Sequence, residues 1–108
     1  MEKISLIIPC YNEEESLPYL FAELKKVTAE MAEYDFEMLF VDDGSKDNTL
    51  PQLREMAKED GRVKYISFSR NFGKESAMYA GFCNVTGDYA AVMDADMQDP
   101  PSLLPKMM

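Results

Sequence analysis

Apolar residues fall into four short runs, and longer segments with apolar residues at helical spacing separate these runs. Short continuous apolar runs are typical of strands that are buried on both faces of a sheet. Apolar positions spaced three and four residues apart predict amphipathic helices. The expected strands cover residues 4–9, 36–41, 63–68 and 88–93, and the expected helices cover residues 17–33, 49–60 and 74–85.

Local signals mark the ends of the first two helices. Ser16 is placed to cap the first helix, Pro18 fits its first turn, and the helix is expected to end near Glu33. Pro51 likewise fits the first turn of the second helix. The first helix would bury Leu17, Leu20, Phe21, Leu24, Val27 and Met31, and the second would bury Leu50, Leu53, Met56 and Ala57.

The alternation of strands and helices predicts an α/β fold, in which a mostly parallel sheet with right-handed crossovers is flanked by helices. The chain has 108 residues and neither a linker nor a repeat, so we expect one domain over residues 1–108. A further helix would start near Ser102, but the sequence stops at Met108, shortly after an acidic motif. The domain is therefore expected to be truncated.

Charge narrows the choice of partners. The sequence holds 11 Lys and Arg against 20 Asp and Glu, which gives a net charge of -9. Such a chain repels the phosphate backbone of nucleic acids, so nucleic acid is not an expected partner. A ligand that carries phosphate would need a bound metal ion, a few placed cations or a helix amino terminus to hold it.

Cysteine and histidine content excludes several kinds of site. Cys10 and Cys83 lie far apart in the sequence, so neither a zinc knuckle nor a disulfide scaffold is indicated, and a reduced, cytoplasmic setting is expected. The absence of histidine excludes a Ser-His-Asp triad and a Cys-His dyad, and it leaves oxygen ligands that favour Mg²⁺ or Mn²⁺. No apolar stretch approaches the ~18–20 residues that span a bilayer.

Two acidic clusters follow expected strands, at the carboxyl ends where open α/β sheets bind ligands. One is Asp42 with Asp43, and the other is Asp94 with Asp96. Two carboxylates two residues apart can approach one hard cation, and Gln98 can add a neutral oxygen, so the second cluster predicts a Mg²⁺ or Mn²⁺ site. In the alternative interpretation, this second pair only caps the turn and helix that follow.

The first cluster combines structural and functional signals. Gly44 would adopt a positive φ, and Ser45 or Asp47 would cap the next helix. One of the two carboxylates of Asp42 and Asp43 can accept the N–H of a nucleobase or bond a ribose hydroxyl. Burying two adjacent acids for structure alone would be costly, which favours the functional interpretation.

Two further groups of residues are expected near the same edge. Tyr11, Asn12 and Glu13 follow the first strand, where an aromatic ring beside polar acceptors suits a base, although the same residues also fit a helix start and an exposed loop. Arg70 and Lys74 lie in the loop before the third helix and at its start. They are candidate contacts for a pyrophosphate, or they balance nearby acids.

Several other classes of site are disfavoured. A Gly-x-Gly-x-x-Gly fingerprint and a Walker loop are both absent, which argues against NAD binding and P-loop phosphoryl transfer. A phosphotransfer receiver would need a lone Asp after the third strand, where this chain has Ser67-Phe68-Ser69. A non-catalytic nucleotide-binding or metal-binding module that kept only the sheet remains an alternative.

Four motifs stand in order along essentially the whole chain: Ile7-Ile-Pro-Cys-Tyr-Asn-Glu13, Val41-Asp-Asp-Gly-Ser-Lys-Asp-Asn-Thr49, Ser69-Arg-Asn-Phe-Gly-Lys74 and Met93-Asp-Ala-Asp-Met-Gln-Asp-Pro-Pro101. Taken together, and in this order, they resemble the nucleotide-sugar half of family 2 glycosyltransferases of GT-A fold. The last two motifs are most similar to those of enzymes that load a sugar onto a polyprenyl phosphate, such as dolichol-phosphate mannosyltransferases and bacterial undecaprenyl-phosphate glycosyltransferases.

The resemblance implies an inverting, metal-dependent transfer of a sugar from a UDP- or GDP-sugar. It places four residues, Pro9, Tyr11, Glu13 and Asp42, around the base and ribose. The expected nucleotide-sugar contacts are Pro9, Tyr11, Asn12, Glu13, Asp42, Asp43, Arg70, Lys74, Asp94 and Ala95, and the expected ligands of Mg²⁺ or Mn²⁺ are Asp94, Asp96 and Gln98.

Family members continue with an acceptor-binding half, so catalytic residues are expected outside this chain and the chain alone is expected to lack transferase activity. A lipid phosphate is the expected acceptor. Membrane association at the cytoplasmic face would then come only from regions absent here. An uncovered sheet would also favour self-association into a homo-oligomer.

Overall fold

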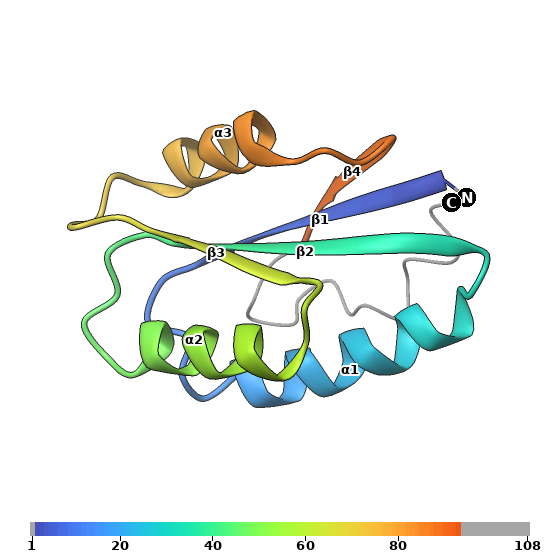
Figure 1. Cartoon of the computed structure of the whole chain (residues 1–108). Coiled ribbons are helices and arrows are strands. Elements are labelled where there is room, and N and C mark those ends of the chain that lie inside the picture. Colours follow the sequence, from blue (N-terminus) through green and yellow to red (C-terminus); the bar gives the residue numbers. More distant parts are fainter. Residues whose placement is uncertain (1, 94–108) are drawn as a thin grey trace.

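Strands and helices alternate along the chain as the sequence predicts. The computed structural model describes residues 2–93. The elements in chain order are β1 (Glu2–Cys10), α1 (Leu17–Glu30), β2 (Tyr34–Asp42), α2 (Thr49–Glu59), β3 (Val63–Ser67), α3 (Lys74–Asn84) and β4 (Tyr89–Val92) (Figure 1).

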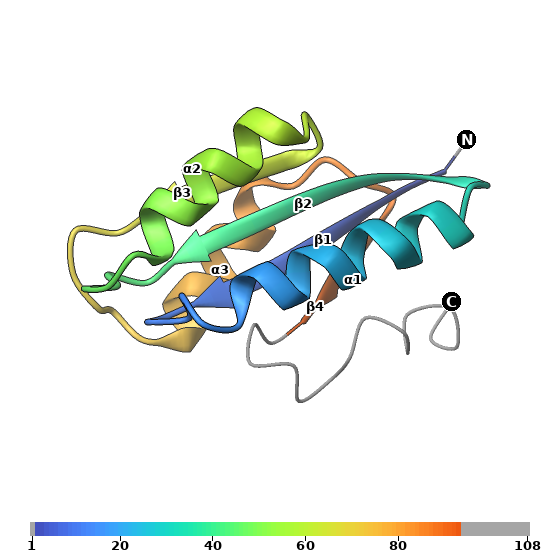
Figure 2. The same ribbon diagram turned by 90° about the horizontal axis from the view of Figure 1, so that it is seen from below.

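One parallel sheet contains all four of these strands, in the order β3-β2-β1-β4. β1 is central: Glu2 lies beside Tyr34 at one end of its pairing with β2, and Cys10 lies beside Asp42 at the other. Figure 2 shows the long β1 and β2 side by side along their whole length. Because all strands run the same way, their carboxyl ends share one edge, which confirms the expected α/β fold.

Helices cover both faces of the sheet, with α1 and α2 on one side and α3 on the other (Figure 1). The alternation of side chains along β1 and β2 divides the core in two. The six residues predicted to form the buried face of α1 are all buried. The larger cluster includes Ile4, Leu6, Ile8, Met38 and Phe40 with α1 and α2, and the smaller one joins Leu39 and Val41 to Ala77 of α3.

The helix ends differ in detail from the predictions. Ser16 occupies the N-cap position of α1, but its side chain makes no capping hydrogen bond. α1 ends at Glu30 rather than near Glu33, because Met31 leaves the helical region at φ -106° and ψ 53° and the chain turns into β2. In α2 the predicted Leu53 and Met56 are buried, whereas Leu50 and Ala57 are only partly buried.

A buried acid near the amino end of β2 was not anticipated. Glu37 is 2% exposed. One of its oxygens accepts hydrogen bonds from Ser5 Oγ and the Thr86 N–H, both at 2.8 Å, and the other accepts one from Lys64 Nζ at 2.9 Å. Lys3 Nζ lies 3.6 Å from the second oxygen. Burial alone would raise the pKa of Glu37, but the hydrogen bonds from Lys64, Thr86 and Ser5, together with the Lys64 charge, lower it to about 2.

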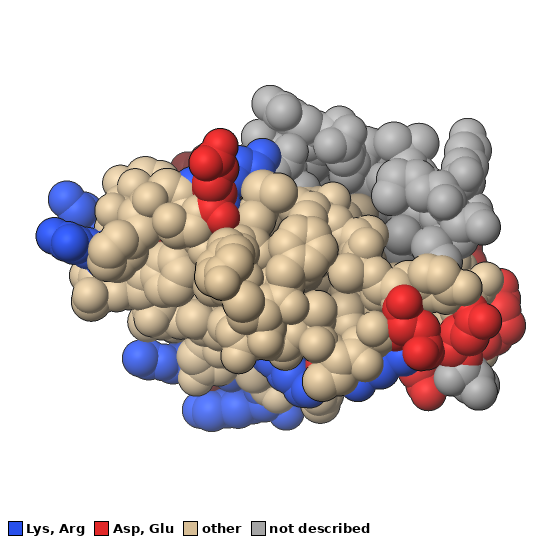
Figure 3. Space-filling view, turned by 90° about the horizontal axis from the view of Figure 1, so that it is seen from above, with Lys and Arg blue, Asp and Glu red and all other residues tan. Residues whose placement is uncertain are grey.

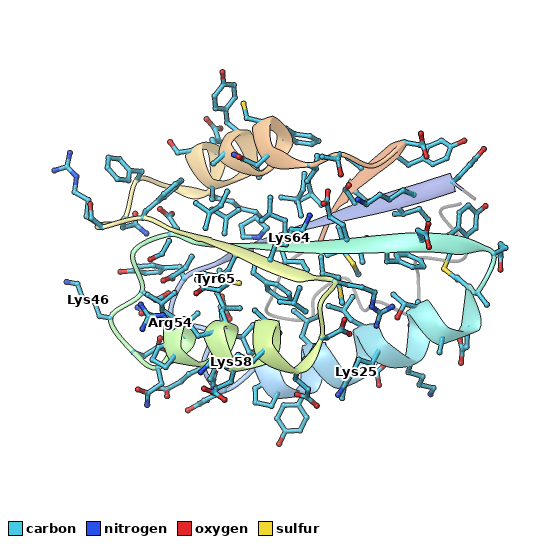
Figure 4. All side chains as sticks on the ribbon, in the orientation of Figure 1. Lys25, Lys46, Arg54, Lys58, Lys64 and Tyr65 are labelled. Atoms are coloured by element: carbon cyan, nitrogen blue, oxygen red, sulfur yellow. The ribbon has the colours of Figure 1, made fainter. Side chains whose placement is uncertain are left out.

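β3 is an edge strand, and positive side chains border it. Figure 4 shows Lys64 and Tyr65 on β3, Lys46 in the loop before α2, and Arg54 and Lys58 on α2. Charged residues on an edge strand discourage pairing with a second sheet. These positive side chains contrast with the chain as a whole, which carries a net charge of -9.

The face of the molecule formed by α3, on the other side of the sheet from α1 and α2, is largely uncharged (Figure 3). Two aromatic residues of α3 are well exposed, Tyr79 at 73% and Phe82 at 50%. Such a surface would favour self-association, which stays a prediction. Within residues 2–93, none of the helices combines the length and the apolar character needed to cross a membrane.

Candidate functional site

The loops that follow β1 and β2 are hydrogen-bonded to each other at the carboxyl edge of the sheet. The Asn12 N–H donates to Ser45 Oγ at 2.8 Å, and the Lys46 N–H donates to Asn12 Oδ1 at 2.9 Å. The Glu13 N–H donates to Thr49 Oγ1, also at 2.8 Å. Asn12 has a φ of 53°, a conformation that asparagine tolerates better than most residues. These bonds fix the position of the β1 loop relative to the start of α2.

Asp47, rather than Ser45, supports the start of α2. Asp47 Oδ1 accepts hydrogen bonds from the Thr49 N–H at 2.9 Å and from Thr49 Oγ1 at 2.6 Å. Burial alone would raise the pKa of Asp47, but the hydrogen bonds from Thr49 and the Glu14 N–H lower it. The Ser45 hydroxyl instead serves the β1 loop. Of the two predicted caps, only the carboxylate therefore bonds the helix start.

The loop after β3 approaches Gly44 closely. Gly44 has a φ of 76°, as predicted, and a Cβ atom on it would lie 2.2 Å from the carbonyl carbon of Arg70 and 2.4 Å from the nitrogen of Asn71. Any side chain at this position would displace the backbone of the third loop. The glycine thus permits the loops after β2 and β3 to touch.

Asp43 fastens this third loop. Its Oδ1 accepts the Phe72 N–H at 2.8 Å, and its Oδ2 accepts the Gly73 N–H at 3.0 Å. Asn71 Nδ2 donates to the backbone carbonyl of Asp43 at 3.2 Å. Hydrogen bonds to a charged acceptor are stronger than those between neutral groups, so the carboxylate holds the loop firmly. Sequence reasoning missed this role because it joins residues almost thirty positions apart.

A cavity of about 360 Å³ opens between the three loops. Its walls combine hydroxyl, carboxylate and guanidinium groups with apolar side chains, which suits a ligand with both an aromatic and a charged part. The lining residues are Tyr11, Asp42, Gly44, Ser45, Lys46, Leu50, Ser67, Phe68, Ser69, Arg70 and Asn71.

Asp42 contributes a buried carboxylate to this cavity and is 1% exposed. Its Oδ1 accepts the Ser45 N–H at 3.1 Å, and its backbone carbonyl accepts the Phe68 N–H at 2.9 Å. These bonds fix the side chain between the loops after β2 and β3. A carboxylate oxygen can accept more than one hydrogen bond, so Asp42 retains capacity to accept from a ligand.

Cys10 lies beside Asp42 in the sheet but is not a nucleophile. Burial raises the pKa of the Cys10 thiol strongly, and the charges of Glu13 and Asp42 raise it further. The thiol therefore stays protonated, and a neutral thiol is a poor nucleophile. Its hydrogen bond to the Ile8 carbonyl is consistent with a structural role.

The structure brings three of the predicted contacts together at the cavity: Tyr11, Asp42 and Arg70. The other predicted contacts within the described residues lie around it without lining it. Pro9 is paired with Val41 inside the sheet, and Lys74 is the first residue of α3. Asn12, Glu13 and Asp43 take part in the loop contacts described above.

Sequence reasoning missed several lining residues. Eight of the lining residues were not proposed as contacts, although most of them follow a strand end. Applying to β3 the same rule that had been applied to the first two strands would have found the residues at its end. The missed residues are Gly44, Ser45, Lys46, Leu50, Ser67, Phe68, Ser69 and Asn71.

The predicted metal ligands Asp94, Asp96 and Gln98, and the predicted contact Ala95, lie outside the described residues. Within residues 2–93, no group of three or more His, Cys, Asp or Glu side chains is placed to hold a metal ion. The Mg²⁺ or Mn²⁺ site therefore stays a prediction.

Comparison with known proteins identifies the family. The sequence model of the family described as Glycosyl transferase family 2 matches residues 5–108. The chain belongs to glycosyl transferase family 2. This confirms the resemblance read from the four motifs, and the described fold agrees with it.

Two curated relatives are named as glycosyltransferases or sugar transferases, and the name of one of them includes a lipid carrier, undecaprenyl phosphate. The chain is 43% identical over 109 residues to "Undecaprenyl-phosphate 4-deoxy-4-formamido-L-arabinose transferase" of Proteus mirabilis, covering 100% of this chain and 33% of the relative. It is 52% identical over 101 residues to "Putative glycosyltransferase CsbB" of Bacillus subtilis, covering 94% of this chain and 30% of the relative. The chain thus spans about a third of the length of these relatives.

Solved structures share the fold. The S. aureus TarS fragment 1-349 in complex with UDP-GlcNAc matches with a TM-score of 0.70 and 29% identity, over 87% of this chain and 26% of that chain. The mannosyltransferase PcManGT from Pyrobaculum calidifontis, solved with GDP-Man and Mn²⁺, matches with a TM-score of 0.77 and 22% identity, over 88% of this chain and 28% of that chain.

Proposed function

We propose that this chain carries the nucleotide-sugar donor site of an inverting, metal-dependent glycosyltransferase whose acceptor is a polyprenyl phosphate. The observation that carries the proposal is the cavity at the carboxyl edge of the sheet, where Tyr11, Asp42 and Arg70 meet. Family membership and the names of the relatives support the class of donor and of acceptor.

Each of the three residues has a distinct task in the proposed site. The Asp42 carboxylate accepts an N–H of the base, which both uracil and guanine present. Tyr11 offers an aromatic ring, 42% exposed, against which the base packs. The Arg70 guanidinium pairs with the diphosphate, for which its geometry is well suited. Lys74, at the start of α3, is proposed to add a second positive charge for the diphosphate.

Asp94, Asp96 and Gln98 are the proposed ligands of a Mg²⁺ or Mn²⁺ ion, and Ala95 between them is proposed to contact the nucleotide-sugar. The ion would neutralise charge on the diphosphate. In the transfer, an acceptor phosphate oxygen forms a bond to the anomeric carbon while the bond from that carbon to the diphosphate breaks. UDP or GDP leaves with the electron pair, and the configuration inverts. A phosphate acceptor is already anionic, so it needs little help from a base.

Calorimetry with UDP and with GDP, each in the presence of Mn²⁺, tests the donor site. We expect one of the two nucleotides to bind, and Asp42→Asn to weaken it about tenfold, because a charged acceptor is replaced by a neutral one. The variant keeps an oxygen for the Ser45 N–H, so the fold should persist. Asp35→Asn, an exposed position at the opposite end of β2, is the matched control and should bind normally.

Two results would contradict the proposal. If the folded protein binds neither nucleotide, the chain is a non-catalytic module that kept only the fold. If Asp42→Asn and Asp35→Asn bind equally well, the cavity is not the base site. Transfer itself is assayed with labelled UDP- and GDP-sugars and undecaprenyl phosphate in vesicles, and we expect no turnover from the 108-residue chain alone.

We further propose that the protein works in the cytoplasm or at the cytoplasmic face of a membrane, where the lipid carrier is reached through regions outside this chain. Fractionation of cells that express the corresponding full-length protein tests this placement. Recovery of the protein outside the cytoplasmic membrane and the cytosol would contradict it.

A further inference from the structure

The guanidinium of Arg70 lies over an aromatic ring at the mouth of the cavity. Its central carbon is 4.9 Å from the centroid of the Phe72 ring. The Phe72 ring in turn meets the ring of Phe68 edge to face, with 5.6 Å between centroids and an interplanar angle of 89°. Arg70 and Phe68 both line the cavity. A cation held over a ring face has fewer accessible orientations than a free arginine side chain.

Burial does not explain where Phe72 lies. Its side chain is 51% exposed, so about half of an aromatic ring faces solvent. Hydrogen bonds position the backbone of Phe72 instead, because Asp43 accepts the N–H groups of Phe72 and of the next residue, Gly73. Asp43 itself is 3% exposed. The buried carboxylate thus holds the backbone from which the exposed ring extends, and the Arg70 guanidinium lies over that ring.

Arg70 is available for an anionic ligand. Within residues 2–93 its side chain forms no ion pair. Other basic side chains do form ion pairs with acids: Lys3, Lys25, Lys58, Arg62 and Lys64. An arginine that is already in place binds a phosphate group without the entropic cost of being ordered by it.

We propose that Phe72 and Asp43 are positioning residues that hold the Arg70 guanidinium at the cavity before the ligand arrives, so that a nucleoside diphosphate meets a preorganised cation. The inference rests on the proposed donor site and deepens it. Neither residue needs to touch the ligand. Both act through Arg70, and this dependence separates the inference from a merely structural role.

Phe72→Leu tests the role of the ring. It removes the aromatic face and keeps an apolar side chain, and we expect UDP or GDP, whichever binds with Mn²⁺, to bind about two- to fivefold more weakly. Phe82→Leu on α3 is the matched control, because Phe82 is 50% exposed and, within residues 2–93, has no cation over its ring. The control should bind as the unchanged protein does. Equal affinities of the two variants would overturn the inference.

A double-mutant cycle shows whether the effect passes through Arg70. Arg70→Ala alone should weaken nucleotide binding about 10- to 100-fold, as expected for the loss of charged hydrogen bonds. In the Arg70→Ala background, Phe72→Leu should then change affinity by less than about twofold. If Phe72→Leu weakens binding by the same factor with and without the arginine, the ring acts independently and the proposal is wrong.

NMR spectroscopy of the unliganded protein tests the arrangement without any nucleotide. In Asp43→Asn, the Phe72 and Gly73 amide hydrogens should exchange faster, because one of the two acceptors is replaced by an N–H donor. The Arg70 side-chain N–H resonance should lose its ring-current shift in Phe72→Leu and keep it in Phe82→Leu. Unchanged exchange at both amides, or an unchanged Arg70 resonance in Phe72→Leu, would refute the positioning role.

These measurements also separate this inference from the proposed function. If neither UDP nor GDP binds the unchanged protein, the donor site is refuted. The positioning of Arg70 is then decided by the NMR results and by titration with inorganic pyrophosphate, which should perturb the Arg70 resonance only when Phe72 is present. If nucleotide binds but the variants at Phe72 and Asp43 behave as controls, only the inference fails.

Discussion

Glu37 near the amino end of β2 and Asp42 at its carboxyl end are both buried, at 2% and 1% exposure, yet their oxygens meet different partners. Glu37 faces lysines on β1 and β3. Asp42 accepts a backbone N–H from Ser45 and faces a cavity. Within residues 2–93 no lysine or arginine forms an ion pair with Asp42 or with its neighbour Asp43.

The difference is the one expected between an acid with a structural role and the acid proposed to bind a ligand. A buried carboxylate is costly unless its charge is compensated, and at Glu37 the compensation comes from the protein itself. At the carboxyl end Asp42 is held by loops around a cavity, which leaves part of its hydrogen-bonding capacity for the proposed ligand. Burial is the same at the two acids, so the kind of partner that each acid has is what distinguishes them.

The largest effect is expected where the loops of the carboxyl end touch. Gly44→Ala should lower the free energy of unfolding by about 3 to 5 kcal/mol, because it combines a positive φ with a Cβ in collision with the Arg70 backbone. Urea denaturation measures the loss. Gly61→Ala, which would meet no atom within 4 Å, should change stability by less than about 1 kcal/mol. Equal losses would mean that the loops are not in close contact.

Glu37→Gln should destabilise the protein by about 3 kcal/mol at neutral pH, because it leaves two lysines facing a neutral group. Chemical denaturation measures this change. Glu59→Gln is the control, since Glu59 is 63% exposed in its pair with Lys25 and should contribute less than about 1 kcal/mol. A cost at Glu37 as small as that at Glu59 would remove the contrast between the two ends of the sheet.

The pH dependence of stability should carry the same signature. The pKa of Glu37 is lowered from 4.5 to about 2, so its contribution is complete above about pH 5 and is lost as the pH falls toward 2. The pKa values of Asp47 and Asp60 are also lowered, so these two acids lower the stability of the unchanged protein and of Glu37→Gln alike as the pH falls. The difference in the free energy of unfolding between the two proteins therefore reports on Glu37 alone, and it should shrink from about 3 kcal/mol to near zero as the pH falls toward 2. A difference in stability that is constant with pH would contradict this prediction.

The smallest effect is expected from removing one of the two lysines that lie near Glu37. Lys64→Met should cost about 1 kcal/mol, because Lys64 is 54% exposed and Lys3 remains near the carboxylate. Lys58→Met, in a pair between two side chains that are each 76% exposed, should cost less. A thermal unfolding series compares the two variants, and a larger loss at Lys58 would argue against the compensation assigned to Glu37.

The fold could be predicted because its signals are local. The apolar runs and the helical spacing of residues such as Leu20 and Leu24 placed every described strand and helix, and Asp42 was expected at the edge of the sheet where it is found. Glu37 could not be predicted in the same way. Its partners Ser5, Lys64 and Thr86 are brought to it by strand register and by the loop after α3, and neither is visible in a local pattern.

The site shows the same limit. Tyr11 and Arg70 follow the ends of their strands closely. This position, together with an aromatic ring and a positive charge, predicted that they lie at this edge of the sheet, where both line the cavity. Asp43 was predicted with Asp42 as an acid at a strand end that could contact the nucleotide, and the structure adds that its oxygens accept the N–H groups of residues 72 and 73. Adjacent residues at a strand end point in different directions, so their tasks separate only in three dimensions.

The placement of β1 between β2 and β4 bears on how the polypeptide is made. Lys3 and Asp88 are hydrogen-bonded although they lie 85 positions apart. At ~5–20 residues per second, the ribosome needs roughly 4 to 17 seconds to deliver β4 after β1. During that interval one side of β1 has unpaired N–H and C=O groups. Until β4 is synthesised, the nascent chain therefore exposes a strand edge that could pair with other chains. We expect chaperones to bind it mainly during this interval.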